Sequence, residues 1–352
     1  MKRFLKGALH VHTSLSDAKI SPQKVVRKYK AQGFDFIVFT DHKYNFNIPD
    51  FVNDDMGMIL IGGVELDVGI KEEDDYKTMP NEDLRATLIM SRMRNEFDDL
   101  AWPHVNALGV YNTNMKFKVV DGDVPKTYEN MIDVINQNKG IPMINHPNWW
   151  FCTSLRELLQ VNRNYLMEIG ACCECDYGGN HNKENIEQVW DILLTKGKKI
   201  FGTFTDDSHH FNDEYNNEDF DPDCGVGYVE VWAEKNEESI LNAIKAGEFY
   251  SSNGIYLDEY TVSDKGISIK VKPEEGVKYA IMFKGKMGIL LKTVYGTEAQ
   301  YTFDGNEWED YVRVKVVSNK LKGDDDTHWQ VERRQYFEAL YTQPILRKKG
   351  VK

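Results

Sequence analysis

The sequence predicts an α/β fold followed by a smaller all-β region, and two patterns along the chain support this. Up to about residue 254, short apolar runs rich in Val, Ile and Phe alternate with amphipathic helical patterns; after it, only short strands and turns alternate. The 352 residues also exceed the roughly 250–300 over which a single core grows. We therefore expect two domains, residues 1–254 and residues 255–352.

The first of these regions contains eight predicted strands and four predicted helices. The strands are the apolar runs at residues 4–11, 34–40, 57–66, 104–111, 140–146, 164–171, 198–205 and 226–233. The helices are the amphipathic segments at residues 21–32, 127–140, 185–198 and 238–252. In the first helix Ser21 is the expected N-cap, Pro22 occupies the first turn and Gly33 follows the end. This order predicts parallel strands joined by crossover helices, in either an α/β barrel or an open doubly wound sheet.

The second region shows strand-like runs without a convincing long helix. Its strands are expected at residues 260–271, 278–285, 288–295, 299–303, 311–317 and 335–346. Turns are expected at Asp264-Lys265-Gly266 and Asp304-Gly305-Asn306. This pattern is typical of a small β-sandwich.

The composition excludes several classes of function. With 41% hydrophobic residues the chain is globular, and no apolar run approaches the roughly 18 residues of a membrane span. The first residues are too polar for a signal peptide, and five cysteines, an odd number, do not suggest a disulfide framework, so we expect a cytoplasmic protein. A net charge of −13 argues against a broad nucleic-acid surface, but not against an anionic substrate held by bound cations. The sequence makes no prediction of oligomeric state.

A pair of histidines near the start of the chain is the first sign of a site. His10 and His12 lie two residues apart at the end of the first predicted strand. Because side chains alternate across a strand, both project from one face and can reach the same ion, while Val11 faces away.

Further histidines and carboxylates stand at the edges of other predicted strands. They are Asp41, His42, Glu65, His104, His146, Asp207 and His209. In barrels of this kind the loops after the strands form the active site, so these scattered residues are expected to converge. Each one alone is more often a structural residue; together they predict a metal site, because a metal removes the cost of burying a carboxylate such as Glu65.

Two assignments depend on spacing. Asp206 and Asp207 compete for the same role, and we favour Asp207 because it shares a strand face with His209. Asp17 is either a ligand beside His42 and His209 or a helix cap; we favour ligation because Ser21 already serves as cap. Imidazole and carboxylate donors without thiolate suit zinc, manganese or iron.

The motifs HVHTSLSD, FTDH, GVELD, the isolated His104, NHP and TDDSH, in this order, resemble those of the polymerase and histidinol phosphatase (PHP) family across residues 5 to 255. The run AIKAGEFYSSNG and the tail ending in YTQPI look like the two-domain bacterial members with a C-terminal β-sandwich. The resemblance implies a distorted (β/α)7 TIM-like barrel and two or three divalent metal ions.

The resemblance also implies three ligand sets. They are His10, His12, Glu65 and Asp207 for one ion; Glu65 as the bridge with His104 and His146 for a second; and Asp17, His42 and His209 for a third. Some members have a histidine where this chain has Asp17. Glu168 matches a strand-end position of the family and is not assigned to metal.

The expected function is a metal-dependent phosphoesterase that hydrolyses a small phosphorylated metabolite or nucleotide by attack of a metal-bridging hydroxide. We expect Glu65, Asp207 and His209 to be catalytic. Weaker candidates for substrate contacts are Lys43, Trp149 and His210, and His210 or His181 for protonating the leaving group. Two alternatives remain: an amidohydrolase-like C–N hydrolase using the same metal site, and a non-catalytic binding module.

Overall fold

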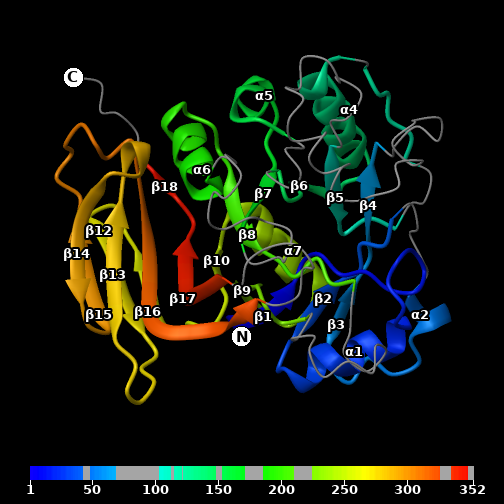
Figure 1. Cartoon of the computed structure of the whole chain (residues 1–352), viewed down its shortest axis with the longest axis horizontal. Helices are drawn as coiled ribbons and strands as arrows, with labels where there is room; N and C mark the ends of the chain where they lie inside the picture. Colours follow the sequence, from blue (N-terminus) through cyan, green and yellow to red (C-terminus); the bar gives the residue numbers. More distant parts are fainter. Residues whose placement is uncertain are drawn as a thin grey trace.

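The computed structural model describes residues 1–42, 48–68, 103–111, 115–120, 122–147, 153–170, 185–209, 224–325 and 334–347. Its strands form three sheets, of ten, five and three strands, and helices pack beside them (Figure 1). Among the described residues, no helix is long and apolar enough to cross a membrane.

The bounds of the elements are as follows. The ten-stranded sheet has the order β14 (Leu290–Tyr295), β13 (Tyr279–Lys284), β16 (Tyr311–Asp325), β17 (Arg334–Thr342), β10 (Phe249–Ser252), β9 (Tyr228–Ala233), β1 (Arg3–Ala8), β2 (Phe36–Val38) and β3 (Ile59–Ile61), with β18 (Ile345–Leu346) beside β16. The five-stranded sheet has the order β4 (Gly63–Asp67), β5 (His104–Leu108), β6 (Ile141–Ile144), β7 (Leu166–Gly170) and β8 (Phe201–Phe204). The three-stranded sheet has the order β11 (Leu257–Val262), β12 (Gly266–Val271) and β15 (Glu298–Thr302). The helices are α1 (Pro22–Ala31), α2 (Ile48–Phe51), α4 (Val124–Gln137), α5 (Leu155–Gln160), α6 (Ile186–Thr195), α7 (Glu237–Ala246) and the 3-10 turn η7 (Lys286–Gly288).

The first helix shows how the sequence pattern becomes structure. α1 has Pro22 in its first turn and ends just before Gly33, whose φ of +79° is the left-handed conformation that glycine adopts without strain. Its apolar stripe, including Val26 and Tyr29, is fully buried against β2 and β1. Burial of this stripe holds α1 against the strand that leads to His10 and His12.

The α/β class is confirmed, but the strands are not all parallel as predicted. β1 and β2 are parallel, as are β6, β7 and β8, whereas β5 is antiparallel to both β4 and β6, and β9 is antiparallel to β1. Periodicity along one strand carries no information on its direction, which the connection before it decides. Because β5 runs in the opposite direction, its first residue, His104, lies opposite Asp67 at the end of β4.

The strand pairings do not confirm a closed barrel. None of the three sheets described here closes on itself. Two isolated bridges link the five-stranded and ten-stranded sheets, Val11 to Ser208 and His42 to Glu65, and both lie beside predicted site residues. The two sheets therefore meet where the histidines and carboxylates gather.

The predicted strand at residues 57–66 is in fact two strands in different sheets. β3 pairs with β2, and after Gly62 the chain moves to the five-stranded sheet, where β4 pairs with β5. A side chain at Gly63 would place its Cβ 2.8 Å from the carbonyl oxygen of Phe39 and 2.9 Å from that of Ala107. Only glycine allows the backbone to pass this close to both neighbours, and the shift brings Glu65 beside His42.

The predicted helix at residues 238–252 also ends earlier than expected. Its last turn closes at Gly247, which adopts a φ of +77°, and residues 249–252 form β10 between β9 and β17. Because β10 pairs with β9 before residue 254 and with β17 after residue 255, the ten-stranded sheet contains strands from both predicted domains. The domain boundary between residues 254 and 255 remains a prediction.

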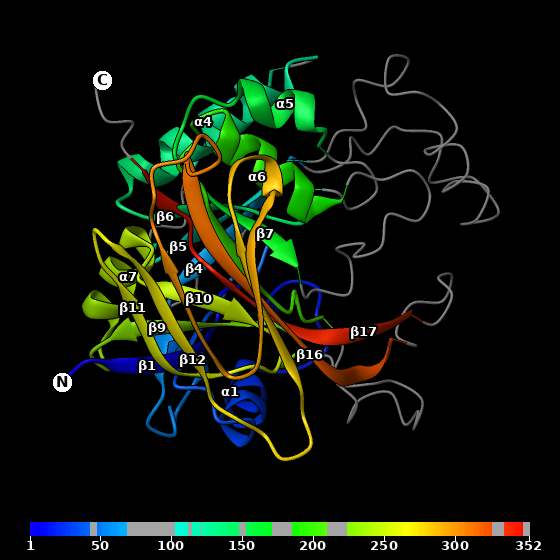
Figure 2. The same ribbon diagram turned by 90° about the vertical axis from the view of Figure 1, so that its left-hand side faces the viewer.

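The described residues of the C-terminal region form β-strands and no α-helix, as predicted, with the short 3-10 turn η7 between β13 and β14. The three-stranded sheet packs against β13, β16 and β17 through one apolar cluster that includes Ile269, Phe283 and Val314. Figure 2 shows β16 and β17 as a long antiparallel pair, and β17 continues the pairing to β10.

Candidate metal centre

The residues predicted to bind metal lie together where the two sheets meet. They form three overlapping groups of donor atoms: His10, His12, Glu65 and Asp207; Glu65, His104 and His146; and His12, Asp17, His42 and His209. These groups coincide with the three ligand sets that the family resemblance implies. Whether ions bind to them stays a prediction.

The first group is fully buried and tightly spaced. The Nε2 atoms of His10 and His12 each lie 3.1 Å from Oε2 of Glu65, and 3.0 and 3.2 Å from Oδ1 of Asp207. None of the four residues is more than 2% exposed. Donor atoms about 3.0–3.4 Å apart are expected around an ion with bonds of about 2.0–2.1 Å.

Asp207 provides a separate test of whether this group fits a metal. Its Oδ1 is buried and accepts no hydrogen bond from any described residue, although two imidazole nitrogens lie within 3.2 Å. A buried carboxylate oxygen without such a partner is costly unless a cation binds it. The donor set therefore fits a divalent ion.

Glu65 connects the first group to the second. Its Oε2 faces His10 and His12, whereas its Oε1 lies 2.9 Å from Nδ1 of His104 and 3.6 Å from Nε2 of His146. Asn145 donates a hydrogen bond of 2.6 Å to the same Oε1 and orients the carboxylate. One carboxylate thus presents an oxygen to each of two neighbouring groups, which is the geometry of a bridging ligand.

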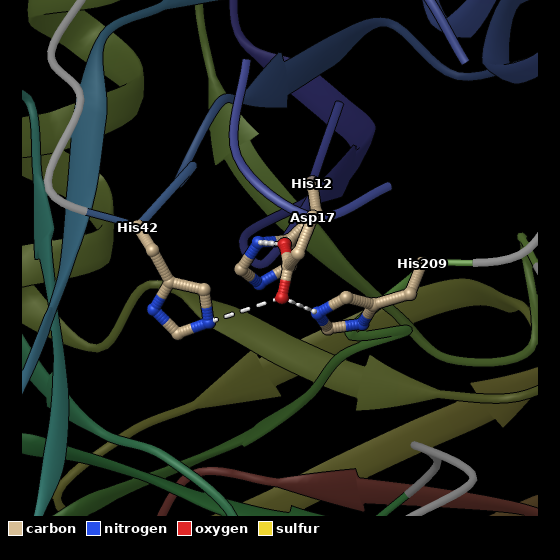
Figure 3. Close-up of side chains that lie close together, drawn as sticks. All are labelled: His12, Asp17, His42 and His209. Carbon is tan, nitrogen blue, oxygen red and sulfur yellow. Dashed lines mark ion pairs between the residues drawn. The ribbon is translucent and has the colours of Figure 1, made fainter. Parts of the chain in front are cut away.

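Asp17 lies at the centre of the third group (Figure 3). Its Oδ2 is 3.2 Å from Nε2 of His209 and 3.5 Å from Nε2 of His42, and its Oδ1 is 3.3 Å from Nδ1 of His12. Ser21 makes no side-chain capping bond, so the reason we gave for favouring ligation by Asp17 over a capping role does not hold. The carboxylate nevertheless faces the three imidazoles. The third group is also the most open, since the side chain of Asp17 is 47% exposed.

Burial and charge together set the protonation of the cluster. Burial opposes the charged form of His10, but the carboxylates of Asp207, Glu65 and Glu168 outweigh it and raise its pKa well above the ordinary value. The same balance raises the pKa of His146 to about 10, through Glu65 above all. For Glu65, burial is outweighed by His10 and His104, which hold its pKa well below the usual range. Glu65 is thus ionised and suited to a cation at neutral pH.

Several buried groups orient the imidazoles, and sequence reasoning gave none of them this role. Glu168 lies in the middle of β7 and accepts a hydrogen bond of 2.7 Å from Nδ1 of His10. Nδ1 of His42 lies 3.2 Å from Asp67, and Nδ1 of His209 lies 2.9 Å from the carbonyl oxygen of Asp207. An acceptor on one ring nitrogen fixes the proton there and leaves the lone pair of the other nitrogen for a metal. The alternation in GVELD, which puts Asp67 on the same face as Glu65, could have indicated its place.

The two other aspartates of the motifs have structural roles. Asp41 accepts hydrogen bonds from the backbone and hydroxyl of Thr13 and from the hydroxyl of Ser16, and so shapes the turn before Asp17. Asp206 points away from the cluster, as predicted, and accepts from Tyr29 and from the backbone amides of Gly225 and Gly227. These contacts fix the chain on both sides of the site.

The backbone is strained at two of the clustered residues. Asp207 has a φ of +49° and His146 a φ of +20°, values that non-glycine residues rarely adopt. Such conformations cost roughly 1–3 kcal/mol each and persist where a function requires them. The backbone amide of His146 donates a hydrogen bond of 2.6 Å to Glu168, which helps to hold the strained conformation of His146.

Other predicted residues lie outside the described part of the chain. They are the substrate-contact candidates Lys43, Trp149 and His210, and His181.

Comparisons with known proteins agree with the family resemblance. The model of the PHP domain family matches residues 8–241, and no curated protein matches the sequence. Among solved structures, a two-domain protein of Bacteroides vulgatus containing a predicted PHP-like metal-dependent phosphoesterase is 13% identical over 90% of both chains, with a TM-score of 0.42. A proposed metal-dependent phosphoesterase of Bifidobacterium adolescentis is 12% identical, over 58% of this chain and 87% of its own, with a TM-score of 0.37. An amidohydrolase of Chromobacterium violaceum, with bound sulfate and no metal, is 15% identical over 62% of this chain and 93% of its own, with a TM-score of 0.34.

At these TM-scores the three structures carry no argument about function. The family model, in contrast, spans more than half of the chain, and its range includes every residue of the three donor groups. The chain belongs to the PHP domain family.

Proposed function

We propose that this protein is a metal-dependent phosphoesterase that hydrolyses a small phosphorylated metabolite or nucleotide. The observation that carries the proposal is Glu65, a fully buried carboxylate with one oxygen in each of two adjacent groups of histidines. A bridging carboxylate at this position is suited to a pair of divalent ions.

Two or three ions would be held by the side chains of the three groups. His10, His12 and Asp207 would share the first ion with Glu65; His104 and His146 would share the second; and His42, His209 and Asp17 would hold the third. The absence of thiolate from these sets favours zinc, manganese or iron. When bound, such ions lower the pKa of a shared water and neutralise charge on a phosphoryl group.

The exposure of the three proposed catalytic residues suggests two different roles. Glu65 and Asp207 are buried and would hold the ions in place, whereas the side chain of His209 is 21% exposed and would face the substrate. The contact between Nδ1 of His209 and the carbonyl oxygen of Asp207 directs Nε2 toward the partly exposed Asp17. We propose these three as the catalytic residues.

Charge favours a role for the ions in substrate binding. Asp17, Glu65, Asp67, Glu168 and Asp207 all lie within or beside the cluster, and the whole chain has a net charge of −13. Divalent ions would offset these carboxylates and attract a phosphate ester. Affinity for inorganic phosphate should therefore depend on added metal.

Other predictions from the sequence belong to the same proposal. Lys43, Trp149 and His210 would contact the substrate. The fold would be a distorted (β/α)7 barrel over residues 1–254 with an accessory β-sandwich over residues 255–352, and the protein would be cytoplasmic.

Hydrolysis of chromogenic phosphate esters tests the proposal. Metal-stripped protein is assayed with p-nitrophenyl phosphate and its bis-ester, before and after addition of Mn²⁺ or Zn²⁺. We expect activity only with metal, abolished by Glu65→Ala or His12→Ala and retained by Glu275→Ala, an exposed control. Full turnover in metal-free protein would contradict the mechanism, and turnover of carboxamides instead of phosphate esters would favour a C–N hydrolase.

A further inference from the structure

The strand that leads to Asp207 and His209 is the last strand of its sheet. β8 pairs on one side with β7, through Met167 opposite Gly202, and no strand follows it in the described five-stranded sheet. The backbone groups of Gly202 that point away from β7 therefore need other partners, because the position is buried.

A side chain from the C-terminal tail supplies those partners. The Oε1 of Gln343 accepts from the amide of Gly202 at 2.8 Å, and its Nε2 donates to the carbonyl oxygen of Gly202, also at 2.8 Å. Ser251, in β10, donates a second hydrogen bond of 2.8 Å to this oxygen. Gln343 is 3% exposed and Ser251 is fully buried. A primary amide thus pairs with β8 as the backbone of a neighbouring strand would.

Gly202, which Gln343 contacts, lies where only glycine fits. A Cβ at Gly202 would lie 2.5 Å from Ile169 and 3.1 Å from Trp190, so the packing on the other side of β8 leaves no room for a side chain. β8 is therefore held between its own sheet and the C-terminal region.

A second set of contacts holds the helix that precedes β8. Arg313 of β16 is fully buried and binds Asp191 of α6 through two hydrogen bonds, of 2.8 and 2.7 Å. Lys284 of β13 and Lys315 of β16 both bind Glu187, one turn earlier. Bidentate arginine pairing of this kind fixes orientation as well as distance. Both α6 and β8 are thus attached to the C-terminal sheets.

The carboxyl end of β8 enters the metal centre directly. Asp207 and His209 follow Gly202 by five and seven residues, and the carbonyl oxygen of Ser208 accepts from the amide of His12 at 3.3 Å. A shift of β8 would change the distances from Asp207 to His10 and His12, which are now 3.0 and 3.2 Å.

We propose that Gln343 is a positioning residue of the metal centre. Its amide completes the edge of β8 and so fixes the strand from which Asp207 and His209 reach the other ligands. The C-terminal region, including the YTQPI segment noted in the family resemblance, is then part of the structure that holds the metal ligands in place, and is more than an accessory module. The inference rests on the proposed function only in taking Asp207 and His209 as metal ligands.

Amide hydrogen exchange on the metal-free, full-length protein tests the positioning itself. Two variants are compared with wild type. Gln343→Leu removes both contacts to Gly202, whereas the control Thr342→Val leaves them in place and removes the hydrogen bond of 2.9 Å from the amide of Val314 in β16 and a long one of 3.5 Å to the carbonyl oxygen of Gln343. We expect Gln343→Leu to accelerate exchange of the Gly202 and His12 amides by about tenfold or more, since both report on β8. Thr342→Val should leave both rates unchanged.

Metal affinity is then measured by titration with Mn²⁺ alone. Misplacement of supporting groups commonly weakens binding by about 10–100-fold, and we expect a loss in this range for Gln343→Leu and none for Thr342→Val. If Gln343→Leu does not fold, Ser251→Ala, which removes one of the two donors to Gly202, should show the same effects at smaller size.

Three results would overturn the proposal: unchanged exchange at Gly202 or His12 in Gln343→Leu, equal effects in Thr342→Val, or faster exchange with wild-type Mn²⁺ affinity. If wild-type protein binds no Mn²⁺, the proposed function fails, whereas the two exchange rates still decide the role of Gln343.

Discussion

Replacement of Glu168 by glutamine is the most informative single substitution near the cluster. Glu168 is fully buried and accepts three hydrogen bonds, from Nδ1 of His10 at 2.7 Å, from the hydroxyl of Thr205 at 2.8 Å and from the amide of His146 at 2.6 Å. Glutamine keeps the shape of the side chain but replaces one accepting oxygen by a donating NH₂ group. At least one buried donor must then face another donor.

The expected size of the effect follows from these contacts. A buried donor left without an acceptor costs about 1–3 kcal/mol. If the glutamine NH₂ faces His10, the ring must carry its proton on Nε2, the atom that faces Glu65 and Asp207. We therefore expect Glu168→Gln to weaken metal binding by about 10–100-fold, equivalent to about 1.4–2.8 kcal/mol.

Competition with a chelator measures the affinity, and ¹⁵N spectra of histidine-labelled protein saturated with Zn²⁺ report which ring nitrogen of His10 carries the proton. The control is Thr205→Val, which removes one donor and leaves the carboxylate free to hold His10 and His146. Its affinity should stay close to that of wild type. If Glu168→Gln binds Mn²⁺ as tightly as wild type and His10 keeps its proton on Nδ1, the assigned role of Glu168 is refuted.

Three further predictions concern the third metal group, the pH dependence and the C-terminal region. Asp17→Asn should remove one bound ion and leave those at Glu65, because the Asp17 carboxylate lies 3.5 Å from His42 and 3.2 Å from His209; metal analysis that finds no change would count against the third group. Burial, opposed by Lys6, raises the pKa of Glu230 to about 7 from 4.5, so the folded protein binds this proton more tightly than the unfolded chain does. Stability from this group is complete below about pH 4.5 and is lost as the pH rises through about 7, by at most about 3 kcal/mol, and Glu230→Gln should remove this component in urea unfolding measured at pH 5 and pH 8. Deletion of residues 255–352 should leave the chain insoluble or without bound metal, because Glu187 and Asp191 lose their cations; a soluble, fully active product would show that the β region is dispensable.

The convergence of the candidate ligands could be predicted from the sequence because it depends on local rules. Alternation along the extended chain that follows β1 put His10 and His12 on one side, and the ends of short strands carry most of the candidate ligands. Asp207 was also chosen correctly over Asp206, but not for the reason given, because both lie beyond the end of β8 and Asp207 has a φ of +49°. These rules need no knowledge of how the strands are ordered.

Contacts between residues far apart in the sequence could not be predicted from these local rules. The direction of β5 depends on the connection before it, and the shift of sheets at Gly63 depends on the carbonyl groups of Phe39 and Ala107, which are distant in sequence. The hydrogen bonds of Glu168 and Gln343 join elements 158 and 141 residues apart. In each case the sequence shows the residue but does not show which distant residue it contacts.

One helix could have been found and was not. α5 follows Ser154, and Ser154 and Glu157 form a capping box in which each side chain bonds the backbone of the other. The spacing S-x-x-E before an apolar run is a known sign of a helix start. The helix is only six residues long, and its periodic pattern is correspondingly weak.

The central claim is that Glu65 holds divalent ions between the two buried groups. Native mass spectrometry of the purified protein, titrated with Mn²⁺ or Zn²⁺, counts the ions bound to each chain. We predict two or three ions per chain for wild type, with those of the first two groups lost in Glu65→Ala and the full count kept in Glu275→Ala. A wild-type chain that binds no ion at saturating metal, or a Glu65→Ala chain with the wild-type count, would contradict the account.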